Sequence, residues 1–189
     1  YRLYCAALVR DVNATMCNYV LYSDDFGANW KVLGGTDIAP IPSGADEPKA
    51  EELPDGSVVI SSRCNGGRYY NIYSFTSAKK AEGSWGTVAF SGKNNNGVTA
   101  EGNSCNGEIM ILPVTRRADN KPLYLALQSL PFGSGRANVG VYYKELASYE
   151  DFCSADSLAA NWEGRHQASR MSSAYSTMTL RSEEHTSEL

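Results

Sequence analysis

The sequence predicts an all-β fold, because short apolar runs of strand length alternate with turn motifs along most of its 189 residues. No segment has the apolar period of a convincing long helix. Tryptophans recur at about the spacing of a four-stranded blade, which favours stacked propeller blades over a sandwich. With 42% hydrophobic residues, the chain is long enough for one buried core. We therefore expect a partial β-propeller of about three blades.

The expected strands are runs in which apolar or aromatic residues alternate or cluster. Turn sequences such as DDFG, LPDG and NNNG separate them, as antiparallel hairpins require. The segment 147–161 is compatible with a short helical turn and equally with a long connection. The expected strands are 2–9, 18–23, 57–61, 69–75, 108–114, 123–130, 138–146 and 174–180.

The first hairpin contains SDDFGANW, in which Ser23, Asp25, Gly27 and Trp30 match S-x-D-x-G-x-x-W, the Asp-box pattern. A turn of this kind needs a residue that tolerates positive φ, an acceptor for free amides and an apolar plug. Gly27, Asp25 and Trp30 are expected to supply these in turn. The motif is therefore predicted to be structural.

Two looser copies of this pattern, at 77–85 and 154–162, each place the tryptophan one position late and lack part of the box. Trp30, Trp85 and Trp162 lie 55 and then 77 residues apart. These distances are near the length of one blade, so the copies indicate a repeated unit.

The segment DEPKAEELPDGSVVISSR (46–63) predicts a hairpin with a three-residue loop at PDG. Leu53 then pairs with Ser57, and counting outward places Glu47 opposite Arg63. Directly opposed residues share a face of the sheet, with Cβ atoms about 4.5–5.5 Å apart. We expect this carboxylate and guanidinium to stand together at the open end of the hairpin. Taken alone, the simplest interpretation is a surface ion pair.

Two later segments, GSGRANVGVYY (133–143) and SSAYSTM (172–178), make the pattern more specific. Together with the Asp box and the hairpin, and in this order, they resemble the exo-α-sialidases (neuraminidases) of the bacterial six-bladed propeller family. The resemblance covers about residues 1–180. It implies that this range forms part of a catalytic propeller of the sialidase type.

The resemblance also implies roles for four residues by match of motif. Tyr175 corresponds to the nucleophile and Glu47 to the glutamate that partners it. Arg63 and Arg136 correspond to two members of the arginine triad that binds the substrate carboxylate. Each has a simpler interpretation by itself: Tyr175 as a half-buried strand aromatic, for example, and Arg136 as a loop charge.

The residue types suit the implied chemistry. Sialic acid carries a carboxylate on its anomeric carbon, which would repel a carboxylate nucleophile, whereas a neutral phenol avoids this repulsion. A free phenol has a pKa of about 10 and needs a base within hydrogen-bond distance. Glu51 and Glu52 are alternative bases, but the pairing and the motif both select Glu47. Arginine suits the carboxylate because its planar fork donates two parallel hydrogen bonds.

The chain departs from the family pattern at its start. The first triad arginine and the aspartate general acid/base of the family would lie upstream of the Asp box, and Arg2 and Arg10 lack the required motif. We therefore carry over neither role and expect this chain to be an inactive fragment of a longer protein.

Residues 181–189, RSEEHTSEL, match the translation of a common sequencing-library adapter. We expect them to be a sequencing-adapter artefact and exclude them from fold and function. The alternative is a genuine acidic tail.

Composition excludes several classes of function. A formal charge of −4 without a basic run argues against nucleic acid or an anionic membrane surface as partner. No apolar run approaches the roughly 20 residues of a membrane helix. Five cysteines without a CxxC motif and two histidines do not form a zinc site of ordinary spacing, so no metal is expected.

The resemblance implies a secreted or periplasmic parent protein that removes terminal α-linked sialic acid from glycans, glycoproteins or glycolipids. The reaction retains anomeric configuration and needs no metal or organic cofactor. One alternative is a non-catalytic sialic-acid-binding propeller that keeps the arginines for recognition. Another is an Asp-box propeller without any connection to sialic acid.

Overall fold

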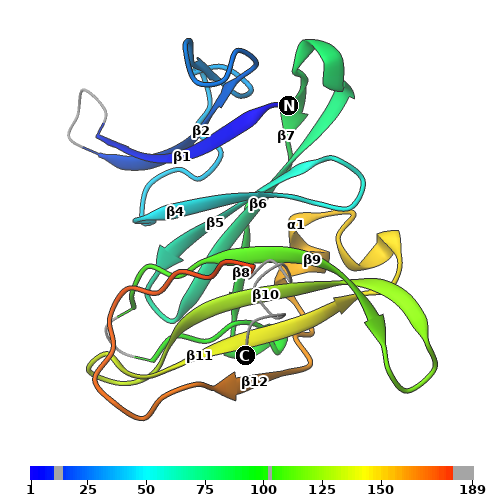
Figure 1. The fold of residues 1–189 in the computed structure, drawn as a ribbon. Coiled ribbons are helices and arrows are strands. Elements are labelled where there is room, and N and C mark those ends of the chain that lie inside the picture. Colours follow the sequence, from blue (N-terminus) through cyan, green and yellow to red (C-terminus); the bar gives the residue numbers. More distant parts are fainter. Residues whose placement is uncertain (11–14, 102–103, 181–189) are drawn as a thin grey trace, which may run out of the picture.

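The computed structural model describes residues 1–10, 15–101 and 104–180, and this part of the chain is all-β, as predicted. Three antiparallel sheets, here called A, B and C, follow one another along the chain and are stacked in that order (Figure 1). Residues 181–189, the expected adapter artefact, lie outside the described residues. Within the described ranges, no helix has the length and apolar character to cross a membrane.

Each sheet is built mainly from strands that are neighbours in sequence. In sheet B, β8 (Ala89–Gly92) pairs with the part of β6 (Gly67–Ser77) that lies beyond the end of β7 (Glu82–Trp85). Sheet A contains β1 (Leu3–Arg10), β2 (Met16–Ser23) and β3 (Lys31–Val32). Sheet B contains β4 (Pro48–Glu52), β5 (Val58–Cys64), β6 (Gly67–Ser77), β7 (Glu82–Trp85) and β8 (Ala89–Gly92). Sheet C contains β9 (Ile109–Arg116), β10 (Lys121–Gly133), β11 (Ala137–Leu146) and β12 (Gly164–Gln167).

Short helical turns join several strands. The segment 147–161, for which the sequence left two possibilities, contains a 3-10 turn and one short α-helix. The 3-10 turns are η1 (Ala78–Lys80), η2 (Lys93–Asn95) and η3 (Tyr149–Asp151), and the α-helix is α1 (Ala155–Ala159).

The predicted strand at 174–180 is wrong. Residues 173–180 follow the isolated bridge at Ser172 and belong to no described strand. The alternating pattern of AYSTMTL is typical of a strand, but a strand also needs a neighbour for its backbone groups. The segment is instead held by side-chain hydrogen bonds, such as that between Ser176 Oγ and Ser129 Oγ (2.8 Å).

Strand β5 of sheet B is buried on both of its faces, which explains its continuous apolar run. Successive side chains of a strand point to opposite faces. Val58 and Ile60 therefore join the core shared with sheet A, whereas Val59 joins the core shared with sheet C. Large buried side chains in the core between sheets B and C include Tyr70 and Leu130.

The predicted Asp-box turn has the expected backbone geometry. Gly27 has φ +90°, a conformation that glycine adopts without strain. The Asp25 carboxylate accepts the amide of Asn29 (2.8 Å), and Ser23 Oγ accepts the amide of Gly27 (2.9 Å). Trp30 differs from the expected plug, because its ring is 43% exposed and its Nε1 donates to the Gly27 carbonyl (3.0 Å).

The segment that matches the Asp-box pattern and its two looser copies each lead from an inner strand to an edge strand of a sheet. The box joins β2 to β3, the segment 77–85 leads from β6 into β7, and the segment 154–162 lies between β11 and β12. Trp162 is 3% exposed, stacks on Tyr70 and donates its Nε1 hydrogen to Leu158 O (2.9 Å). Each segment thus connects an inner strand to an edge strand, although Trp30 and Trp162 precede that edge strand and Trp85 is its last residue.

The two tryptophans should contribute unequally to stability. We expect Trp162→Ala to lower the free energy of unfolding by about 3–5 kcal/mol, because it empties a buried site in the core between sheets B and C. Trp30→Ala should lower the free energy of unfolding by less, since Trp30 is already 43% exposed to solvent. Urea denaturation of the two variants measures the difference, and equal losses would contradict the assignment of Trp162 to the core.

Candidate functional site

The hairpin of β4 and β5 has the register predicted from the sequence. Pro48 pairs with Ser62, the Leu53 amide donates to Ser57 O (2.8 Å), and the Arg63 amide donates to Glu47 O (3.4 Å). Gly56 in the loop has φ +84°, as a three-residue loop of this type requires. The prediction that Glu47 lies opposite Arg63 is confirmed.

The Glu47 carboxylate receives a donor on each of its two oxygens. Arg63 Nη1 lies 2.6 Å from Oε2, and the Tyr175 hydroxyl donates to Oε1 at 2.6 Å. Arg63 also reaches Asp46 Oδ2 (3.6 Å) and donates from Nε to Ser104 Oγ (3.3 Å). The Glu47 carboxylate thus links Arg63 of the same β4–β5 hairpin to a tyrosine that lies 128 positions from Glu47 in the sequence.

Tyr175 is carried to Glu47 by contacts of its segment with sheet C. The Ser173 amide donates to Arg136 O (2.6 Å), and Ser172 bridges Ala137 at the start of β11. The ring is 57% exposed, so Tyr175 is not the half-buried strand aromatic of the simpler interpretation. Its phenol is open to a ligand from solvent.

Arg136 lies in the β10–β11 turn, beside the tyrosine. Its guanidinium carbon is 5.8 Å from the centre of the Tyr175 ring, within the range of a cation–π contact. The residue has φ +63°, a left-handed conformation that is uncommon for a side chain of this size. The structure therefore brings together all four residues singled out in the sequence: Glu47, Arg63, Arg136 and Tyr175.

The charges and hydrogen bonds at the site shift the pKa values of Glu47 and Tyr175 in opposite directions. Partial burial alone would raise the pKa of Glu47, but hydrogen bonds from Tyr175 and Arg63 outweigh it, so this pKa lies below its ordinary value. The hydrogen bond to Glu47 and the charge of that carboxylate hold the pKa of Tyr175 above its ordinary value. At neutral pH, the resting pair is a neutral phenol that donates to an ionised carboxylate.

Arg68 is a buried arginine next to the site that sequence reasoning missed. Arg68 pairs with Arg63 across the β5–β6 hairpin and is 1% exposed. It donates to Ser61 Oγ (3.1 Å) and to Cys105 O (3.3 Å), next to the Ser104 that accepts from Arg63. Counting pairs across the CNGG turn (64–67) would have placed Arg68 opposite Arg63.

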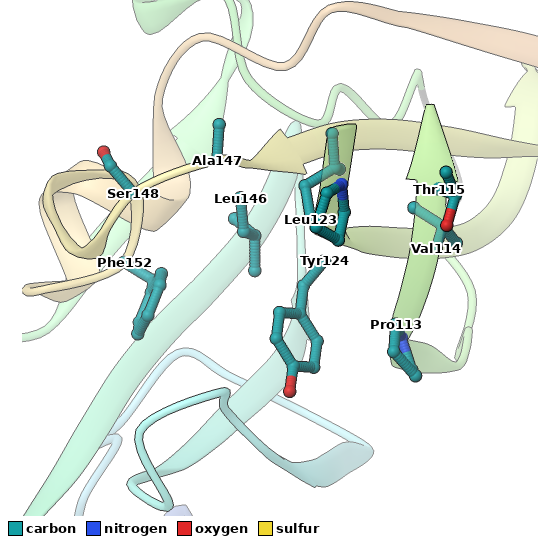
Figure 2. Close-up of a pocket in the computed structure, with 10 residues that line it drawn as sticks. Pro113, Val114, Thr115, Leu123, Tyr124, Leu146, Ala147, Ser148 and Phe152 are labelled. Atoms are coloured by element: carbon teal, nitrogen blue, oxygen red, sulfur yellow. The ribbon is translucent and has the colours of Figure 1, made fainter. Parts of the chain in front are cut away.

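A groove of about 340 Å³ borders the site on the side of Arg63. Its lining includes Asp46, Asn65 and Ser104, so polar groups surround the guanidinium. A separate cavity of about 600 Å³ lies at the end of sheet C opposite the Arg136 turn, where Leu146 and other apolar residues line it (Figure 2).

This arrangement can perform acid–base chemistry on a hydroxyl. The Glu47 carboxylate is within proton-transfer distance of an exposed phenol, and two arginines supply positive charge beside them. An anionic ligand at Tyr175 would meet this charge.

A comparison with models of known protein families finds no match, and a comparison with curated proteins finds none either.

The coupling between phenol and carboxylate predicts reciprocal pKa changes. Tyr175→Phe should raise the pKa of Glu47 toward about 4.3, because one donor to the carboxylate is removed. Glu47→Gln should lower the pKa of Tyr175 toward about 10. Titrations followed by carbon-13 NMR of labelled Glu and Tyr residues measure both values, and unchanged titrations would show that the two groups are apart in solution.

The same shift predicts how acid affects stability. Because the pKa of Glu47 is lower in the folded than in the unfolded chain, its bonds stabilise the protein fully above about pH 4.3. This stabilisation is lost as the pH falls through the folded-state value. The wild type should therefore lose more stability than Glu47→Gln between pH 5 and pH 3, as measured by denaturation at each pH.

Proposed function

We propose that these residues form the nucleophile and carboxylate-binding part of a retaining exo-α-sialidase. The observation that carries the proposal is the 2.6 Å hydrogen bond from Tyr175 to Glu47, whose other oxygen is bound by Arg63. A tyrosine paired with a carboxylate and flanked by arginines is the arrangement that sialic acid chemistry requires. The resemblance of the sequence to the sialidase family points to the same residues.

In the proposed reaction, the Tyr175 oxygen attacks the anomeric carbon while Glu47 Oε1 takes the phenolic proton. Glu47 is suited to this role because it is ionised at neutral pH and already accepts that proton as a hydrogen bond. The departing glycan oxygen is protonated by a general acid, which the family resemblance places upstream of the Asp box. Water then cleaves the glycosyl–tyrosine bond, so the anomeric configuration is retained.

The phenol is well matched to its substrate because it approaches without charge. A carboxylate at the same place would be repelled by the carboxylate on the anomeric carbon. In our proposal, Arg63 and Arg136 bind that substrate carboxylate and orient the anomeric carbon toward Tyr175. Arg136 already lies against the Tyr175 ring, which supports a shared ligand.

The architecture supports a partial six-bladed propeller as the scaffold. Sheets A, B and C are consecutive antiparallel units, and in each a tryptophan-containing segment connects an inner strand to an edge strand. The face of sheet C that points away from sheet B carries apolar side chains such as Leu112, Leu125 and Leu127, which are only partly buried. A further blade packed there would cover them.

The proposed substrates are terminal α-linked sialosides of glycans, glycoproteins or glycolipids, and the proposed location of the protein is secreted or periplasmic. Such substrates are displayed on surfaces and secreted material. No metal or organic cofactor takes part in the proposed steps, because a tyrosine, a glutamate and the arginines supply the nucleophile, base and charge at the anomeric centre.

The decisive test compares two tyrosine variants. We expect Tyr175→Phe to abolish most hydrolysis of a fluorogenic α-sialoside, because it removes the attacking oxygen. Tyr149→Phe is a matched control, since Tyr149 is also 57% exposed but packs on Phe152, away from the site. Turnover is measured in the protein expressed from the complete open reading frame that contains this sequence.

Binding and turnover separate the possible outcomes. Tyr175→Phe should still bind sialic acid, because the arginines remain, whereas Arg136→Met should weaken binding. Near-normal hydrolysis by Tyr175→Phe would refute the assignment of the nucleophile. Sialic acid binding by the wild type without any turnover would identify a non-catalytic sialic-acid-binding propeller instead.

A further inference from the structure

Glu47 and Tyr175, the proposed catalytic pair, lie on two separate segments of the chain. A further carboxylate, that of Glu108, contacts both of these segments. Glu108 Oε2 accepts the Thr177 hydroxyl at 3.0 Å and lies 3.1 Å from Lys49 Nζ. Thr177 is two residues from Tyr175, and Lys49 is two residues from Glu47. In each segment, the residue that contacts Glu108 therefore lies two positions from one member of the catalytic pair.

The alternation of side chains along β4 decides to which face of the sheet Lys49 points. Residues two apart on a strand point to the same face, so Lys49 projects to the face on which Glu47 meets Arg63. On the other segment, Tyr175 and Thr177 both bond to carboxylates, whereas Ser176 between them bonds to Ser129 of β10. The phenol–carboxylate contact and the Glu108 contacts thus form two parallel connections between the segments.

Glu108 itself is firmly placed. Its amide donates to Ser129 Oγ (2.9 Å), and its carbonyl accepts from the Ser129 amide (2.9 Å) and from Gln128 Nε2 (2.9 Å). Its side chain is only 18% exposed, so its contacts with Lys49 and Thr177 are partly shielded from water. These bonds fix the carboxylate relative to sheet C.

The segment of Tyr175 needs such an anchor because residues 173–180 belong to no described strand. Backbone pairing holds it near Ser172 and Ser173, and beyond that point the described bonds to other elements come from side chains. A displacement of about 1 Å at a reacting group can cost about 100-fold in rate. The distance between phenol and base therefore depends on whatever fixes this segment.

We propose that Glu108 is a positioning residue which, through Thr177 and Lys49, holds Tyr175 at hydrogen-bond distance from Glu47. The catalytic meaning of this role rests on the proposed function. The positioning itself is a property of the folded chain and is testable without any substrate.

The test removes the hydroxyl of Thr177 while keeping its shape. In Thr177→Val, the bond to Glu108 is lost, so we expect the carbon-13 titration of Tyr175 to move toward the ordinary midpoint of about 10. Thr177→Ser keeps the donor and should titrate like the wild type. Thr179→Val is the control from the same segment, because the Thr179 hydroxyl donates to the adjacent Leu180 carbonyl and not to Glu108.

Changes at the other two residues test the rest of the connection. Glu108→Gln keeps an acceptor for Thr177 but loses the charge that attracts Lys49, so its effect should be smaller than that of Glu108→Ala. Lys49→Met should shift the Tyr175 titration in the same direction as Thr177→Val. The Tyr175 signal is assigned by its absence from Tyr175→Phe, and dispersed NMR spectra verify that each variant is folded.

The outcomes separate this proposal from the proposed function. A wild-type Tyr175 titration in folded Thr177→Val and Glu108→Ala would overturn the positioning role. A shifted titration in a protein that never cleaves sialosides would support positioning while refuting the sialidase proposal. If both proposals hold, Thr177→Val should lower kcat in the complete protein by up to about 100-fold, and Thr177→Ser should restore it.

Discussion

The hydrogen bond from Ser61 Oγ to Gln128 Oε1, 2.7 Å long, ties sheet B to sheet C in the buried layer beneath the candidate site. Tyr70 donates to the same oxygen, and Arg68 donates to Ser61. Polar groups inside a core must find such partners, and apolar contacts alone would tolerate other alignments of the two sheets. Because Glu47 and Arg63 belong to one sheet and Arg136 to the other, this alignment decides whether the candidate site exists.

Much of the fold and part of the site could be predicted because the controlling information is local. The loop PDG fixes the register of the β4–β5 hairpin, and this register alone places Glu47 opposite Arg63. The short strands β3, β7, β8 and β12 were missed, because two to four residues are too few to show a period. The segment 174–180 does not form the predicted strand because, although its apolar residues alternate, its backbone pairs with none of the described strands.

The contacts across sheets could not be derived from pattern. Tyr175 and Glu47 were linked only through family resemblance, since nothing local to either residue indicates a partner 128 positions away. Glu108 gave no signal, because its bonds to Lys49 and Thr177 join three separate parts of the chain. Such contacts depend on the packing of whole sheets, which short-range propensity does not encode.

The left-handed backbone of Arg136 has a consequence for attempts to engineer this protein. Glycine or asparagine would relax that conformation, and strain of this kind costs on the order of 1–3 kcal/mol. A library selected for thermal resistance alone would therefore enrich for loss of this arginine, together with the positive charge beside Tyr175. Stabilisation of the scaffold and retention of the proposed ligand binding are opposed at this position, so directed evolution has to select for both at once.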